Sequence, residues 1–271
     1  MVKQVRRPDF DFSQVVPHWA PNAEAAQLVN ASHMVPAYIE PFLIKVMRRA
    51  KADLDPERDA QLLADIDVFN QQEGQHAKMH AAALRMVRDH YPGIAEHERA
   101  FRSAYQGFLE RKSLRFLLAY SDGFEAYASA TAQVWVDGRL DRLFQGGDEQ
   151  SLAVWKWHLA EEYEHRSVVF QVYERLYGRP AWRGWLYRVA MYGYSQVHIG
   201  WSTGRLYRHL LGEDRTDMSV GQRKASKRRT RQVAVHTQGR FLTPMIRPLS
   251  PSYDPANLPP PARLDDVLAC Y

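Results

Sequence analysis

Two Glu-x-x-His elements, Glu73-x-x-His76 and Glu162-x-x-His165, constrain the fold of this 271-residue chain more than any other feature. Residues three positions apart lie on one face of an α-helix, so each element aims a carboxylate and an imidazole at a common point. Each is preceded by a helical stretch that holds a lone glutamate, Glu40 before the first and Glu125 before the second. This order predicts a carboxylate-bridged dinuclear metal site inside a four-helix bundle.

The surroundings of the two lone glutamates support this prediction. Glu40 lies within the apolar stretch 34–44, and Glu125 lies within the apolar stretch 116–127. A carboxylate buried in such a stretch needs a partner or a metal. One Glu-x-x-His alone would indicate only a solvated helix face, whereas two copies, each one helix after an embedded glutamate, favour a shared metal site.

The ligand chemistry narrows the choice of metal. A mixture of carboxylates and imidazoles suits iron or manganese, whereas calcium takes oxygen ligands only. We expect two Fe ions, with Mn/Fe or Mn/Mn as alternatives. The predicted ligands are Glu40, Glu73, His76, Glu125, Glu162 and His165.

Two further histidines share the faces of these motifs. His158 precedes Glu162 by four residues, and His80 follows His76 by four. Each is interpreted as an extra ligand or as a group that contacts a ligand. An additional imidazole in place of a water ligand would change which coordination positions stay open.

Metal-bound histidines usually donate their second N–H to a carboxylate or a carbonyl. Asp122, one turn before Glu125, is the best candidate for such an acceptor, and a surface acid is the alternative. Glu161 and Glu164 lie off the main face of their helix. We expect both to face solvent or to form salt bridges, with Arg166 nearby.

Helical patterns dominate the chain and strand signals are nearly absent, so we predict an all-α fold. Residues 1–21 form an expected extended N-terminal arm, residues 22–213 the metal-binding bundle, and residues 214–271 a basic, Pro-rich tail that is extended or disordered. A break is expected near Pro36. The expected helices cover residues 22–52, 55–90, 94–110, 113–137, 148–177 and 182–211.

The last of these helices, residues 182–211, is rich in aromatic side chains. Packing on the bundle as ordinary core is the favoured interpretation. A homodimer interface and an interfacial membrane helix are the alternatives, because arginines flank the apolar positions.

The net charge of +5 is concentrated in the tail. Residues 215–271 carry a surplus of +6, and residues 1–214 carry −1. Six of the nine residues in 223–231 are basic, which permits weak contact with an anionic surface. A solvated flexible segment is the favoured interpretation, and no aromatic residues interleave with these charges, so specific nucleic-acid binding is not expected.

The single cysteine, Cys270, excludes a disulfide framework and a cysteine metal site. The first residues lack the apolar core of a signal peptide, and no uncharged apolar run reaches the length of a membrane span. We therefore expect a cytoplasmic protein. The chain also lacks a Gly-x-Ser-x-Gly elbow, a phosphate-binding loop and a dinucleotide fingerprint.

Three motifs carry a family resemblance: Pro36-x-x-x-Glu40, Gln72-Glu73-x-x-His76-x-x-x-His80, and the segment from Trp155 to His165. Over roughly residues 8–210 the chain resembles the bacterial family named predicted metal-dependent hydrolases, which implies a ferritin-like bundle. Ile39 and Pro41 depart from the usual pattern around the first glutamate. The His158, Glu162 and His165 arrangement is also similar to that of p-aminobenzoate N-oxygenase di-iron enzymes.

These residues allow three functions, all with a small-molecule substrate or metal as the partner. The favoured interpretation is a di-iron oxidoreductase that uses O₂ to oxygenate, N-oxygenate or desaturate a small organic substrate, with electrons from an unidentified donor. The alternative is a hydrolase that uses a hydroxide activated by the dinuclear metal. The third is a non-catalytic bundle that handles iron or is stabilised by metal.

Overall fold

The computed structural model describes residues 4–271, and within that range the chain contains helices and no strand. The predicted all-α fold is confirmed. Residues 4–21 have no regular secondary structure, as expected for the N-terminal arm, and residues 1–3 of that arm lie outside the described part of the chain.

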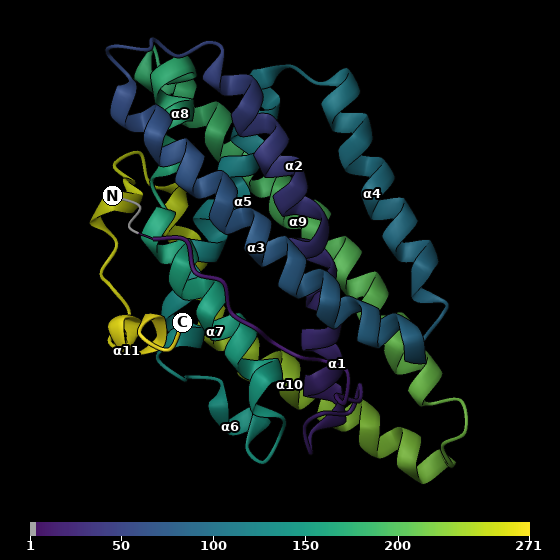
Figure 1. Ribbon diagram of the computed structural model, residues 1–271. Helices are drawn as coiled ribbons and strands as arrows, with labels where there is room; N and C mark the ends of the chain where they lie inside the picture. Colours follow the sequence, from purple (N-terminus) through teal and green to yellow (C-terminus); the bar gives the residue numbers. More distant parts are fainter. Residues whose placement is uncertain (1–3) are drawn as a thin grey trace.

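Four helices surround the centre of the molecule: α2 (Met34–Lys51), α3 (Ala60–His90), α5 (Leu114–Val136) and α7 (Glu149–His165). α2 packs on α3, α3 on α7, α7 on α5, and α5 on α2, which closes a ring around a common interior (Figure 1). The ring consists of the four helices on which the sequence places the predicted ligands.

Local signals explain where these helices begin. The Asp148 side chain accepts a hydrogen bond from the Ser151 amide at 2.8 Å and caps α7, and Ser113 caps α5 in the same way. α1 (Ala23–Ser32) ends just before His33, and α2 begins at Met34. Pro36 therefore lies in the first turn of α2, where its missing N–H has no intrahelical acceptor.

The expected helix over residues 148–177 is two helices. α7 ends at His165, and α8 (Val168–Tyr177) follows after a break at Arg166 and Ser167. The Arg166 guanidinium donates to the Tyr163 carbonyl at 2.7 Å and to the Pro255 carbonyl at 2.7 Å. It therefore satisfies an end of α7 and ties the C-terminal segment to it.

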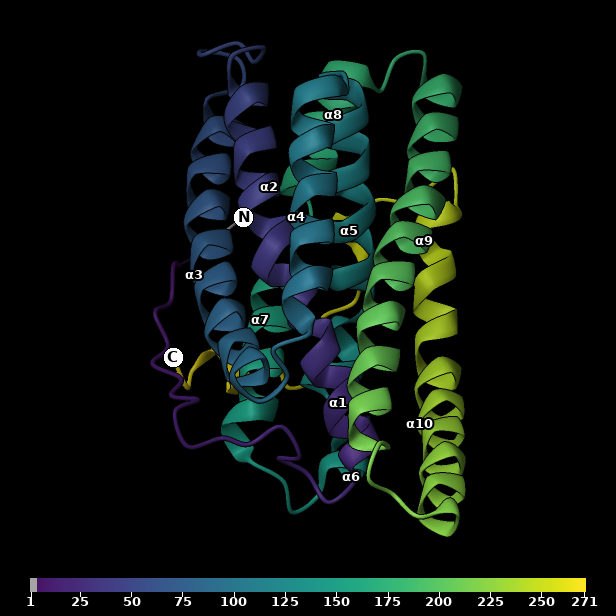
Figure 2. The same ribbon diagram turned by 90° about the vertical axis from the view of Figure 1, so that its right-hand side faces the viewer.

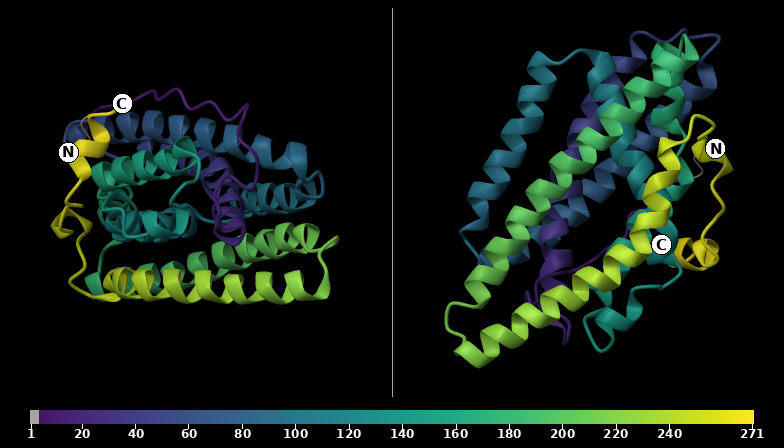
Figure 3. Two further views of the ribbon diagram at one scale, coloured as in Figure 1. Left: turned by 90° about the horizontal axis from the view of Figure 1, so that it is seen from below. Right: turned by 180° about the vertical axis from the view of Figure 1, so that it is seen from behind.

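An outer layer covers one side of the ring. It consists of α9 (Ala181–Asp214) and α10 (Val220–Ile246), which run antiparallel (Figures 2 and 3). α9 packs on α5, on α1 and on α4 (Ile94–Arg111), the connection between the two halves of the ring. Tyr192 is buried as expected for core packing, but Trp182 and Trp201 are 58% and 61% exposed.

The expected extended tail is wrong for residues 220–246, which form α10. Ser219 and Gln222 make a capping box at its start. The Arg229 guanidinium pairs with the Glu24 carboxylate at 2.7 Å, which holds the basic run 223–231 against α1 rather than leaving it flexible. Four short elements complete the chain: α6 (Asp141–Phe144), 3₁₀ turns at Arg247–Leu249 and Pro255–Asn257, and α11 (Leu264–Leu268).

Among residues 4–271, no helix has both the length and the apolar character needed to cross a membrane.

The crossing of α5 and α9 depends on a glycine. A Cβ added at Gly123 would lie 3.1 Å from the Tyr192 Cα and would collide with the Ser195 hydroxyl. By contrast, a Cβ added at Gly193 of α9 would meet nothing within 4 Å. The close approach of these two helices therefore requires glycine at position 123 and not at position 193.

We predict that Gly123→Ala destabilises the protein by about 1–3 kcal/mol, because it forces α5 and α9 apart. Gly193→Ala is the matched control and should stabilise by roughly 0.5–1 kcal/mol, the usual gain for alanine inside a helix. Urea denaturation followed by circular dichroism measures both changes. Equal midpoints for the two variants would contradict the close approach.

Candidate metal centre

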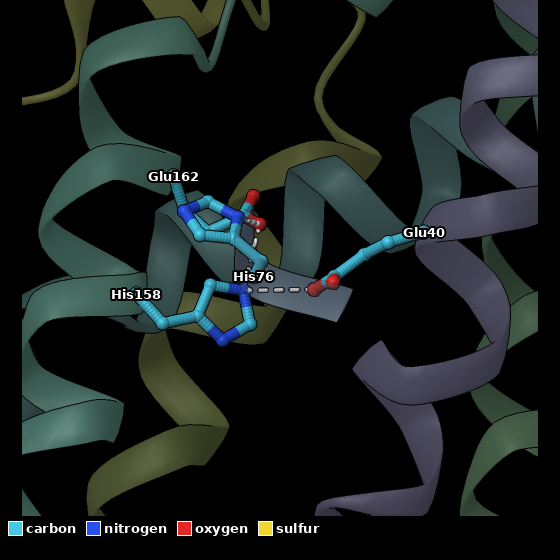
Figure 4. A group of neighbouring side chains, drawn as sticks. All are labelled: Glu40, His76, His158 and Glu162. Carbon is cyan, nitrogen blue, oxygen red and sulfur yellow. Dashed lines mark hydrogen bonds and ion pairs between the residues drawn. The ribbon is translucent and has the colours of Figure 1, made fainter. Parts of the chain in front are cut away.

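Seven of the eight side chains predicted as ligands or possible ligands meet inside the ring of helices. α2 supplies one, α3 two, α5 one and α7 three, and each side chain is no more than 1% exposed. Figure 4 shows four of them pointing toward one another. The seven are Glu40, Glu73, His76, Glu125, His158, Glu162 and His165.

Their ligand atoms form two groups that share Glu162. One group is Glu40, His76, His158 and Glu162, and the other is Glu73, Glu125, Glu162 and His165. In each group the candidate ligand atoms lie within 4.8 Å of one another. Two neighbouring sites with one common carboxylate are the arrangement that a dinuclear centre requires.

The two oxygens of Glu162 face different histidines. Oε1 lies 2.8 Å from His158 Nε2, and Oε2 lies 3.2 Å from His165 Nε2. His158 Nε2 also lies 3.2 Å from Glu40 Oε1, and His165 Nε2 lies 3.1 Å from Glu73 Oε1. Glu162 is therefore common to the two groups, with one carboxylate oxygen toward each histidine.

The other three carboxylates lie near imidazole nitrogens but form no hydrogen bond of good geometry. Within residues 4–271, both oxygens of Glu40, Glu73 and Glu125 are buried without a hydrogen-bond partner, and so is His76 Nδ1. Buried carboxylates in this state are costly unless a cation neutralises them. These orphaned oxygens and the imidazole nitrogen match the donor set of two divalent ions, so the residues fit the predicted metals.

The electrostatics lead to the same conclusion. Burial, followed by repulsion from the neighbouring glutamates, raises the pKa of Glu40 and of Glu73 well above the ordinary value. Burial and the Glu162 charge do the same to the pKa of Glu125. Protons or metal ions must therefore neutralise this cluster.

Glu162 and His165 behave differently because they face each other. Burial opposes the charge of Glu162, but His165 and His158 outweigh it and hold the pKa of Glu162 well below its usual range. Burial likewise opposes the charge of His165, whereas Glu162 and Glu125 raise its pKa well above the ordinary value. Glu162 is thus the carboxylate of the cluster whose ionised form is favoured.

Each candidate ligand histidine uses its second ring nitrogen outside the cluster. His76 Nε2 lies 3.0 Å from Glu161 Oε2, and His165 Nδ1 lies 3.1 Å from Gln72 Oε1. Such outer partners fix the ring orientation and the tautomer of a metal-bound histidine. The nitrogens that remain, His76 Nδ1 and His165 Nε2, face the carboxylates.

The third ring, His158, is held by other histidines. His158 Nδ1 lies 2.7 Å from His80 Nε2, and His80 Nδ1 lies 2.7 Å from His33 Nδ1. Burial, with the neighbouring imidazoles, lowers the pKa of His80 well below its ordinary value and that of His33 to about 3, so both rings are neutral. His80 is therefore outside both ligand groups and orients His158.

The N-terminal arm completes the support of the centre. The Arg6 guanidinium donates to Glu161 at 3.0 Å and to Glu164 at 2.7 Å, and Arg6 is 9% exposed. The Gln72 amide donates to the Gln4 carbonyl at 2.8 Å. Of the three residues that hold the ligand histidines from outside the cluster, Glu161 and Gln72 thus contact residues 4–6, and His80 does not.

One expectation about the outer partners is wrong. Asp122 does not accept from a ligand histidine in the structure; its carboxylate lies 3.7 Å from Arg188 Nη1, and burial raises its pKa to about 6. Glu161 forms one of the salt bridges expected for it, with Arg6, and is fully buried between Arg6 and His76. Glu164 does form a salt bridge, although with Arg6 and not with Arg166.

Four residues that support the ligands were not predicted from the sequence to do so: Arg6, Gln72, His33, and Glu161 as the partner of His76. Gln72 directly precedes the first motif and Glu161 directly precedes the second. Their position next to a candidate ligand could have indicated that both contact a ligand. Nothing in the sequence pairs Arg6 with Glu161, because 155 positions separate them.

Comparison with known proteins identifies the family. The model of a family described as "Predicted metal-dependent hydrolase" matches residues 4–258, so the chain belongs to this family. The resemblance inferred from the motifs is thereby confirmed. The family description supports the hydrolase alternative better than the favoured oxidoreductase. No curated protein and no solved structure matches the chain.

We predict that Arg6→Ala weakens metal binding by about 10- to 100-fold, because Glu161 then loses the cation that orients it toward His76. The measurement is metal affinity from competition with a coloured chelator. Arg7→Ala is the matched control, because the neighbouring Arg7 is exposed, and it should bind metal as the wild type does. Equal affinities for the two variants would show that the arm does not support the centre.

Proposed function

We propose that this protein is a metal-dependent hydrolase with a dinuclear centre. The observation that carries the proposal is the buried cluster itself: carboxylate oxygens that mostly lack a hydrogen bond of good geometry, facing imidazole nitrogens, in two groups that share Glu162. Membership of a family described as metal-dependent hydrolases supports the same reaction class.

In this proposal each half of the cluster holds one divalent ion. Glu40, His76 and His158 would hold one, and Glu73, Glu125 and His165 the other, with Glu162 between them. Ions bound there would lower the pKa of a water molecule and polarise the bond to be cleaved. The protein supplies the position and the charge balance of these ligands.

The surrounding residues perform the remaining tasks. The Arg6–Glu161 pair and Gln72 hold His76 and His165, and His80 holds His158. His80 and His33 are neutral and add no positive charge beside His158. Bound cations would therefore balance the negative charge of the carboxylates there. Complete burial of the ligands limits access of bulk water.

Oxygen activation is the second candidate, and a specific observation favours it. The cluster combines three imidazoles with four carboxylates, all essentially inaccessible to solvent. Such nitrogen and oxygen donors suit iron, and a closed interior suits a reactive oxidant. Two Fe ions with O₂ as cosubstrate, and an electron donor yet to be identified, belong to this candidate.

The dinuclear arrangement predicts a metal content of two divalent ions per chain in protein purified as expressed. Glu162→Ala removes the shared ligand and should reduce the content to near zero, whereas Glu149→Ala, at the exposed start of the same helix, should leave it unchanged. Elemental analysis measures both. A content near zero in the wild type, or one that Glu162→Ala does not change, would refute the dinuclear centre.

The two reactions differ in their need for O₂. Hydrolysis predicts that the metal-loaded protein cleaves members of an ester and amide panel under nitrogen as fast as in air. Glu162→Ala should reduce this rate by at least about 100-fold, since it removes the ligand common to both groups. Conversely, inertness under nitrogen together with O₂ uptake by the Fe(II)-loaded protein would establish the second candidate instead.

A further inference from the structure

A cavity of about 400 Å³ lies directly beside the candidate metal centre. It is bounded by α1, α2, α5, α6, α7, α9 and α10, and its lining is mainly aliphatic and aromatic. Among the described residues, no aspartate, glutamate, lysine or arginine contributes to this lining. A volume of this size suits a small organic ligand, and the lining suits an apolar one.

We infer that this cavity is the substrate chamber and that it takes an apolar small organic molecule, which meets the metal centre at the His158 end. The inference rests on the proposed function for its chemical role, since the molecule in the chamber would be the one that the metal centre acts on. The binding itself is a separate property and is open to separate measurement.

His158 connects the chamber to the centre. Its ring is part of the cavity lining, while its Nε2 faces Glu40 at 3.2 Å and Glu162 at 2.8 Å. None of the other six candidate ligands lines the cavity. A molecule in the chamber therefore meets the half of the cluster formed by Glu40, His76 and His158.

Trp155 forms the aromatic wall at the same end. It lines the cavity beside His158, stacks on the His158 ring with centroids 5.7 Å apart, and is 8% exposed. Its indole N–H is buried and has no hydrogen-bond partner within residues 4–271. Because this nitrogen has essentially no accessible surface, Trp155 presents its aromatic ring to a molecule in the chamber, which suits an apolar ligand.

The wall on the α9 side is built from small residues. Gly200 and Gly204 line the cavity with Thr203, opposite Thr237 and Phe241 of α10. A Cβ added at Gly200 or Gly204 would meet nothing within 4 Å, so these positions border free space. Gly200 is also exposed, so the chamber reaches the surface at this position of α9.

The test uses the metal-loaded full-length protein and 1-aminoanthracene, a neutral apolar fluorophore, with no turnover. Wild-type protein should bind it at one site per chain with micromolar affinity. Gly204→Leu and Gly200→Leu, which place a side chain in the chamber, should each weaken binding at least tenfold. Gly193→Leu is the matched control, because this exposed α9 glycine also borders open space but does not line the cavity, and it should bind as the wild type does.

Thermal melting shows whether each variant is folded. If Gly200→Leu or Gly204→Leu does not fold, the other variant still tests the chamber. Absence of saturable binding by the wild type, or unchanged binding by both glycine variants, would overturn the inference.

Failure of the proposed function is visible separately. Elemental analysis of the same samples should show wild-type metal content in Gly204→Leu, because the ligands are unchanged. If the wild type binds the fluorophore but contains no metal, the proposed metal centre is refuted and the substrate chamber is still supported. If the wild type contains two metal ions per chain but does not bind the fluorophore, the chamber is refuted and the metal centre is supported.

Discussion

The neutralisation of four buried glutamates is the interaction on which the rest of this structure depends. Glu40, Glu73, Glu125 and Glu162 come from four different helices and converge in an interior that excludes solvent. Like charges at this separation cannot all persist without cations, so the ring of helices is stable only when protons or metal ions balance them. Ions bound in place of protons would therefore stabilise the packing of α2, α3, α5 and α7, because these ligands meet only in the folded state.

This constraint explains why segments without regular structure are held so firmly. The arm reaches the centre through Arg6, which neutralises Glu161 and so orients His76. The C-terminal segment lies against the ligand helix α7, where the Tyr163 hydroxyl donates to the Leu258 carbonyl at 2.6 Å. Both ends of the chain thus stabilise α7, the helix that supplies three of the seven clustered side chains.

The candidate site was predictable where its signals are local, and not where they depend on packing. The spacing of Glu73 and His76 sets their common direction through helix geometry alone, and the same holds for His158 and Glu162. Helix periodicity cannot say which neighbour a face meets, so Asp122 was assigned to a histidine although it faces Arg188. The helix α10 was missed because the prolines that follow it outweighed the capping box at Ser219 and Gln222. The other helices were predicted more closely, because capping residues and Pro-Gly pairs are local signals that mark where a helix begins or ends.

The cavity changes the balance between the two reaction classes. Burial of the ligands within helices favours O₂ over a bulky ester only if nothing larger can reach the metals. The chamber beside His158 removes that objection, because an apolar molecule there would lie against one half of the cluster while the other half stays enclosed. The two halves are thus unequal: Glu73, Glu125 and His165 do not border the chamber, whereas His158 of the other half forms part of its wall. This asymmetry arises from a single histidine that belongs to both the cluster and the cavity wall.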